Sequence, residues 1–223
     1  MFSISKFCAA IAITFILTAV APANATPVLD QEYSPDPTLP PSGNAAVGQN
    51  FLGAIFNIGQ TFTVGETGVL SSIEVRVRKA PAIFESLTLD LRTPDGSLPG
   101  LAGATLATAV LSAREIPDTV TSFISFDLSG AGIDVIAGDF LSFVLSSPTL
   151  HSSPASYFIS DSGAEGGYDH GEGFWASYQD GNNFEVRSDL FFRTFVDVPE
   201  PAPLAVLVLG IVAMASARRA HRG

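Results

Sequence analysis

The densest group of chemically active side chains lies between residues 161 and 173. This stretch carries four carboxylates and five glycines in 13 residues. Glycines let a loop fold back on itself, and convergent carboxylate and carbonyl oxygens are the ligands that Ca²⁺ takes in proteins. The candidate calcium ligands are therefore Asp161, Glu165, Asp169 and Glu172. Their spacing is not that of an EF-hand; a solvated acidic loop is the alternative, and no other cofactor is indicated.

Aromatic side chains follow this acidic loop directly. Trp175 is the only tryptophan, Phe174 stands beside it, and Tyr168 and Tyr178 are near in sequence. Aromatic rings flanked by polar loops can stack on sugar rings, and packing in a core is the alternative use of the same rings. Neighbours in a strand point to opposite faces, so Phe174 and Trp175 cannot both face one core. We expect one of them at the surface or at a sheet edge.

Few residues indicate catalysis. The chain has no Gly-x-Ser-x-Gly elbow, no Gly-rich phosphate loop and no His-Glu-x-x-His helix. The single cysteine, Cys8, lies in an N-terminal apolar run that we expect to be removed, which excludes disulfides, cysteine metal sites and cysteine nucleophiles from the mature chain. A glycoside hydrolase needs two carboxylates about 5–10 Å apart, so a polysaccharide-active hydrolase that uses loop carboxylates stays open. The favoured prediction is a protein that is not an enzyme.

The elements that would position these residues are short strands. Apolar and polar residues alternate with a period of two, which is typical of half-buried strands, in residues 60–64, 73–78, 87–92 and 124–128. Residues 140–145 are more continuously apolar, as expected of a strand that is covered on both faces or lies at the centre of a sheet. We read residues 104–111 as a strand, and residues 155–159, 174–178 and 190–196 complete the set.

This pattern predicts an all-β fold. Short strands at this spacing, turns such as Pro94-Asp95-Gly96, and the lack of helical periodicity or repeats favour a single antiparallel β-sandwich or jelly-roll-like domain over residues 49–197. Residues 26–48 are rich in proline, and we read them as an extended lead-in with an edge strand near residues 28–33.

The charge balance limits the partners of this domain. Residues 26–197 contain 21 acidic and 7 basic side chains, a net charge of −14. That is too acidic for a general nucleic-acid binder, which needs a basic face. The whole chain is 47% apolar and only 15% charged, which excludes intrinsic disorder.

The N-terminus reads as a secretory signal peptide over residues 1–25. Lys6 precedes an uncharged apolar run from Phe7 to Val20, and small residues at Ala23 and Ala25 form a cleavage site. We therefore expect a mature chain that begins at Thr26. An uncleaved anchor is the alternative, although the run is short for a hydrocarbon core about 30 Å thick.

The C-terminus, residues 198–223, carries three blocks in order. They are Pro199-Glu200-Pro201, an uncharged apolar run from Ala202 to Ala217, and a basic end with Arg218 and Arg219. As a helix the apolar run would rise about 24 Å, which is marginal for crossing a membrane. The positive-inside rule places the arginines in the cytoplasm and the domain outside.

This tripartite tail resembles the PEP-CTERM sorting signal of exported bacterial proteins, over residues 198–222. The resemblance implies recognition by exosortase, a membrane enzyme thought to cut near the Pro-Glu-Pro motif. It implies export by the secretion machinery across the inner membrane, anchoring by the C-terminal helix, and then release to the cell surface or the biofilm matrix. A plain C-terminal anchor is the alternative for the tail.

The middle of the chain is loosely similar to β-sandwich domains carried ahead of such tails. A module that binds extracellular polysaccharide is the second prediction for its function.

Overall fold

The computed structural model describes residues 25–34, 43–49, 55–81, 83–93, 103–148, 157–163, 167–177 and 183–199. Most of the expected signal peptide, the predicted membrane helix at 202–217, and the tail residues Glu200, Pro201, Arg218 and Arg219 lie outside these ranges. Within them, no helix has the length and apolar character needed to cross a membrane.

The described residues form strands and two short 3₁₀ helices, η1 and η2. In chain order these are β1 (Ala25–Tyr33), β2 (Gly43–Gln49), β3 (Ile55–Thr63), β4 (Gly68–Lys79), β5 (Leu87–Arg92), β6 (Thr105–Leu111), η1 (Ala113–Glu115), β7 (Ser122–Asp127), η2 (Ser129–Ala131), β8 (Ile133–Val135), β9 (Phe140–Ser146), β10 (Tyr157–Asp161), β11 (Gly173–Ser177), β12 (Asn183–Arg187) and β13 (Phe192–Pro199). The pairings among β2 to β13 are antiparallel. The prediction of an antiparallel β fold is therefore confirmed.

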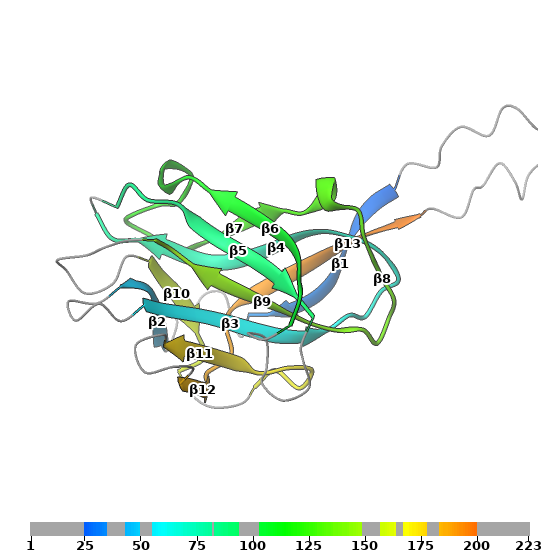
Figure 1. The fold of residues 1–223 in the computed structure, drawn as a ribbon. Coiled ribbons are helices and arrows are strands. Elements are labelled where there is room, and N and C mark those ends of the chain that lie inside the picture. The colour runs from blue at the N-terminus through cyan, green and yellow to red at the C-terminus, as the bar shows by residue number, and fades with distance from the viewer. Residues whose placement is uncertain are drawn as a thin grey trace, which may run out of the picture. The chain divides into compact units, whose positions relative to one another are not determined.

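The strands form one curled sheet whose two halves face each other (Figure 1). The first half, here the β4 layer, contains β1, β13, β4, β10, β7 and β8, with β4 at its centre. The second half, the β3 layer, runs in the order β12, β11, β3, β9, β5 and β6. Strand β2 pairs with β10 and with the start of β3, and so joins the two layers.

Aromatic rings from both layers meet in the core. The ring of Phe192 on β13 lies 6.1 Å from Phe62 on β3 and 5.6 Å from Phe143 on β9, measured between centroids. All three side chains are fully buried. Period-two alternation also places Val75 and Phe126 inside, both with 0% exposure, as the sequence pattern predicts.

The structure extends the sheet to the N-terminal side of residue 49. Both β1 and β2 lie in the segment that we expected to be a lead-in, and β1 lies beside β13 while β2 pairs with β10. Ala45 and Val47 of β2 are core residues. The compact unit accordingly spans residues 27–198, so these strands belong to the domain.

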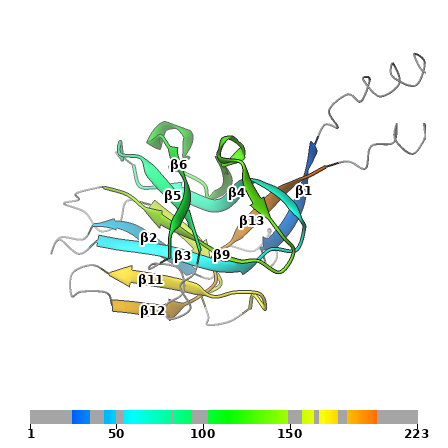
Figure 2. The same ribbon diagram turned by 45° about the vertical axis from the view of Figure 1, so that its right-hand side comes forward.

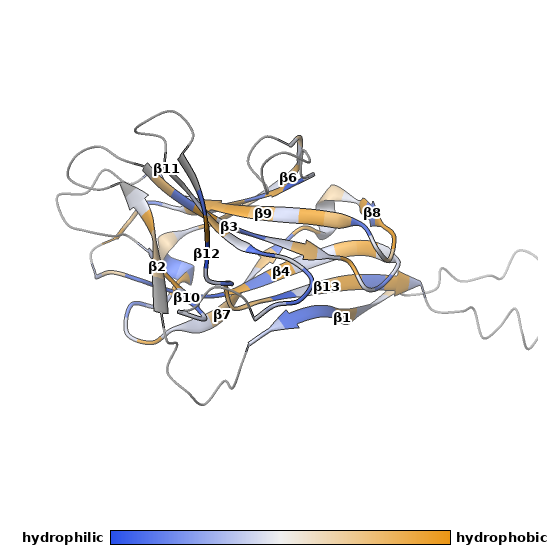
Figure 3. Ribbon diagram, turned by 90° about the horizontal axis from the view of Figure 1, so that it is seen from below, coloured by the Kyte–Doolittle hydropathy of each residue, from blue (hydrophilic) through white to orange (hydrophobic). Residues whose placement is uncertain are grey.

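Two strands show how residue type sets burial. Strand β9 is mostly hydrophobic and β1 mostly hydrophilic, as the hydropathy colours of Figure 3 show. Residues 141–145 of β9 are all buried, which confirms the expectation of a strand covered on both faces. Strand β6 matches the strand expected at residues 104–111.

The first strand begins where the last strand ends. Figures 1 and 2 both show the start of β1 and the end of β13 side by side at one end of the curled sheet. The chain therefore enters and leaves the domain at the same end.

Gly59 in β3 leaves no room for a side chain. A Cβ there would collide with the ring of Phe174 on β11 and with the backbone oxygen of Phe143 on β9. We expect Gly59→Ala to destabilise the domain by about 1–3 kcal/mol, as overpacking does, in urea unfolding followed by fluorescence. Gly130→Ala is the control, because a Cβ at Gly130 meets nothing within 4 Å. Equal midpoints for the two variants would contradict this account of β3.

Candidate functional site

The structure separates the acidic residues that the sequence groups together. Asp161 ends β10 and is buried, and its Oδ1 accepts a hydrogen bond from the N–H of Gly163 at 2.8 Å. Burial raises the pKa of Asp161, while hydrogen bonds from the backbone of Gly163 and Ala45 act in the opposite direction. Asp169 and Glu172 are exposed, and Glu165 lies outside the described residues.

No metal cluster results from this arrangement in the part of the chain that the structure describes. There, no three His, Cys, Asp or Glu side chains lie close enough together to hold an ion. The carboxylate that organises the loop is instead Asp189, which follows β12.

Asp189 anchors the loop through hydrogen bonds. Its side chain is 2% exposed, and it accepts three hydrogen bonds of 3.0 Å, from the Gln60 side chain and from the backbone N–H groups of Tyr168 and Gly173. Gln60 also accepts a 2.9 Å hydrogen bond from the N–H of Leu190. One buried carboxylate therefore joins β3 to both ends of residues 168–173.

Further contacts fix the loop against β3 and the core. The backbone of Glu172 exchanges hydrogen bonds with Thr61, through its oxygen at 3.0 Å and its N–H at 2.7 Å. The Tyr168 ring lies 5.1 Å from Phe192, and its hydroxyl donates to Gln31 Oε1 at 2.9 Å. Burial raises the pKa of Tyr168. The described part of the loop is thus ordered by hydrogen bonds and packing within the protein.

These contacts lead to a prediction about calcium. Because Asp161 accepts a hydrogen bond from the N–H of Gly163 and Asp189 organises the loop, we expect the same melting temperature in 1 mM CaCl₂ and in EDTA. The control is Asp169→Asn, which removes an exposed candidate ligand. A calcium-dependent rise in melting temperature that this substitution abolishes would overturn the expectation and establish a calcium site.

Trp175 and Phe174 lie on opposite faces of β11, as strand geometry requires. Phe174 is 1% exposed, whereas Trp175 is half-buried at the margin of the core. The Arg187 guanidinium lies 4.9 Å from the centroid of the Trp175 ring, and Phe56 meets this ring edge-on at 6.3 Å. A sugar would have to displace Arg187 to stack on that ring face, because cation and sugar compete for the same π-surface.

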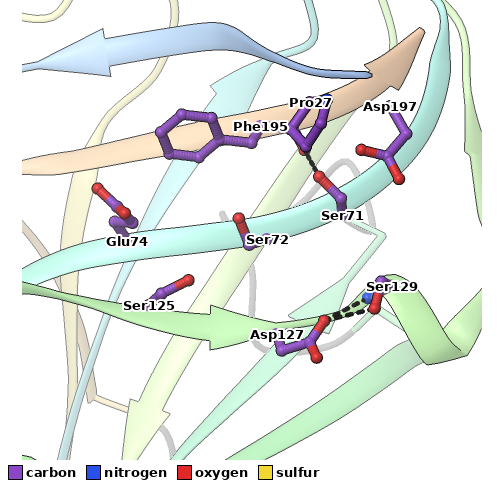
Figure 4. Close-up of a pocket in the computed structure, with 9 residues that line it drawn as sticks. All are labelled: Pro27, Ser71, Ser72, Glu74, Ser125, Asp127, Ser129, Phe195 and Asp197. Atoms are coloured by element: carbon purple, nitrogen blue, oxygen red, sulfur yellow. Dashed lines mark hydrogen bonds between the residues drawn. The ribbon is translucent and has the colours of Figure 1, made fainter. Parts of the chain in front are cut away.

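A shallow, open groove of about 380 Å³ lies on the outer face of the β4 layer (Figure 4). We call it the β4 groove. It crosses β13, β4 and β7. Its polar lining consists of four serines and three carboxylates: Ser71, Ser72, Ser125, Ser129, Glu74, Asp127 and Asp197. Phe195 and Pro27 complete it.

Strand register explains why these side chains share one face. Ser72 of β4 lies opposite Asp127 of β7 and Phe195 of β13. In the next row, Glu74 lies opposite Ser125. Directly opposed residues point to the same side of a sheet, so alternation along β4 places Ser72 and Glu74 on its outer face. A register shift against β13, between Phe195 and Val196, interrupts the alternation at Ser71, which also lines the groove.

The carboxylates of the groove differ in their partners. Asp127 Oδ1 accepts hydrogen bonds from the hydroxyl and the N–H of Ser129, at 2.6 and 2.9 Å, and these bonds lower the pKa of Asp127. Glu74 lies 3.7 Å from Arg193. Asp197 Oδ1 is buried, and among the described residues it has no hydrogen-bond partner.

The groove therefore carries negative charge. None of the described residues that line it is lysine, arginine or histidine. Arg193 lies beside it, but its guanidinium also pairs with Glu32 at 2.8 Å and stacks on Phe123 at 4.1 Å. Sequence analysis missed this groove, although the alternation of Ser72 and Glu74 with apolar residues marks the outer face of β4.

No protein-family model matches the sequence, and no curated protein resembles it closely enough to count as a relative. The chemistry of the domain is therefore inferred from its own side chains.

Proposed function

We propose that this chain is an exported, non-enzymatic protein of the cell surface or the exopolysaccharide matrix, sorted by its C-terminal tail. The observation that carries the proposal is the order of three blocks: Pro199-Glu200-Pro201, the apolar run 202–217, and the arginines at 218 and 219. An exosortase-like membrane enzyme would read this tail after the secretion machinery has moved the chain across the inner membrane. The domain ahead of the tail would be a β-sandwich of jelly-roll type.

The geometry of the domain supports this proposal. The start of β1 and the end of β13 lie together at one end of the sheet. A domain built in this way can be attached through that end and leave the opposite end of the sheet, with its loops, accessible. Two prolines flanking Glu200 favour an extended backbone there, the form in which a protease binds its substrate as a strand.

Mass spectrometry of the protein from its own cell tests the proposal, because it defines both ends at once. We expect an N-terminus at Thr26 and a C-terminus near Pro199 to Pro201. Alanine at both Pro199 and Pro201 should prevent cleavage and leave the tail attached. The control Pro203→Ala lies outside the motif, and its tail should still be removed. Intact residues 202–217 on all of the mature protein would refute processing and leave a plain anchor.

The second candidate is a module that binds extracellular carbohydrate, and the β4 groove favours it. Hydroxyl and carboxylate side chains beside a partly exposed aromatic ring are groups that bind sugars, since they accept and donate hydrogen bonds while the ring covers an apolar sugar face. Retention of the protein on matrix polysaccharide from its own cell would support this function. Passage through such a column without delay would argue against it.

A further inference from the structure

The β4 groove has the chemistry to select one class of polysaccharide. Its serine hydroxyls both donate and accept hydrogen bonds, and its carboxylates only accept them. Two of the hydroxyls already donate within the protein, Ser71 to the backbone oxygen of Phe195 and Ser129 to Asp127. A ligand for the remaining acceptors must offer many donors, as a chain of sugars does. A shallow groove across three strands also suits an extended chain better than a small molecule, which needs a deep pocket.

The groove also has apolar surface for a sugar ring. Phe195 is half-buried, and Figure 4 shows its ring and Pro27 on the same side of the groove. The polar grid repeats at about 4.8 Å across the strands and about 6.8 Å along them. A sugar ring over Phe195 would therefore bring its hydroxyl groups within reach of Ser72 and Asp127 in the same row.

The negative charge of the groove further limits the class of ligand. The groove presents Glu74, Asp127 and Asp197 without a basic lining residue among those described, so polymers of uronic acids would be repelled. A single divalent cation does not fit, because the described residues include no three clustered carboxylates. Asp197 lines the groove, and among the described residues no donor reaches its buried Oδ1. An ammonium group at the groove-facing side of this carboxylate would form a charge-assisted hydrogen bond, which is stronger than a neutral one.

We infer that the β4 groove binds a polysaccharide whose sugars carry protonated amino groups, with an ammonium group paired to Asp197. Phe195 stacks on a sugar ring, and Ser72 of β4 and Ser125 of β7 bind hydroxyl groups. This inference rests on the carbohydrate-binding function proposed above, and it names the class of ligand.

Titration calorimetry of the full chain with short oligomers tests the inference. The probes are a glucosamine hexamer, an N-acetylglucosamine hexamer, a galacturonate hexamer and a lysine hexapeptide. We expect the glucosamine hexamer to bind at least about tenfold more tightly than each of the others, since charge-assisted hydrogen bonds contribute on that scale. Equal binding of the acetylated or the uronate hexamer would overturn the charge argument. Equal binding of the peptide would show a general cation site and overturn the sugar argument.

Matched variants locate the site. Asp197→Asn and Ser72→Ala should each weaken the glucosamine hexamer, the first by about tenfold. Asp169→Asn makes the same change of charge outside the groove and should leave the affinity unchanged. If Asp169→Asn weakens binding as much as Asp197→Asn, the diffuse charge of the protein is responsible and the inference fails. A thermal melt of each variant confirms folding, and Ser72→Ala, on a half-buried side chain, tests the groove if Asp197→Asn does not fold.

Failure of this inference differs from failure of the proposed function. If the protein is retained on polysaccharide from its own cell and Asp197→Asn is retained equally, the carbohydrate-binding function stands and the groove is not its site. If retention fails and the glucosamine hexamer still binds the groove, the groove assignment stands and the matrix of that cell is not the ligand.

Discussion

Replacing Phe192 with alanine should lower the free energy of unfolding by about 3–5 kcal/mol, as for other large buried aromatic residues. The side chain is fully buried, and its ring lies within 6.1 Å of those of Phe62 and Phe143, measured between centroids. It also packs against Tyr168, a residue of the acidic loop at 161–173. The substitution therefore leaves a cavity between the layers and loosens the loop. Urea unfolding monitored by circular dichroism measures the loss.

The matched control for this prediction is Phe84→Ala. Phe84 is 85% exposed, so its truncation should change stability by less than about 0.5 kcal/mol. If the two phenylalanine variants unfolded at the same urea concentration, the two layers would not be held together through Phe192.

The second large effect concerns Asp189. We expect Asp189→Asn to cost at least about 2 kcal/mol, because the amide keeps only one acceptor oxygen for three buried donors and adds donors of its own. The amides of Tyr168 and Gly173 should lose hydrogen-exchange protection first, since both donate to this carboxylate.

Asp134→Asn provides the comparison for this change. Asp134 lies on β8 and is exposed, so the same loss of one negative charge should leave the unfolding midpoint nearly unchanged. Unaltered protection of the Tyr168 and Gly173 amides in Asp189→Asn would show that other contacts order the loop.

Local patterns predicted most of the strands, because alternation follows directly from the geometry of a half-buried sheet. The stretch from Ile73 to Arg78 is an example: Val75 is inside and Glu74 outside, as its own neighbours indicate. The N-terminal extent of the domain was harder to predict. The proline-rich segment hid β2, since its burial depends on β10, more than 100 residues later in the chain.

The candidate sites depend on contacts that local patterns do not contain. The four acidic residues of the loop are close in sequence, but strand β10 buries Asp161 while Asp169 points to solvent. The sequence around Asp189 does not show that it anchors the loop, because this role depends on its contact with Gln60 of β3. One signal was present: Gln60 shares the apolar face of Phe62, and a polar residue on a core face needs a buried partner.

Asp197 lines the β4 groove and stands only five residues before Ala202. A fully extended chain of that length reaches at most about 18 Å. In the proposed anchored state, the groove would thus be tethered within that distance of the first apolar residue of the tail. Lipid headgroups within that distance would restrict the access of a polysaccharide strand to the groove. Cutting the chain near Pro199 would remove this short connection to the anchor. Sorting would then be the step that makes the groove accessible to the matrix.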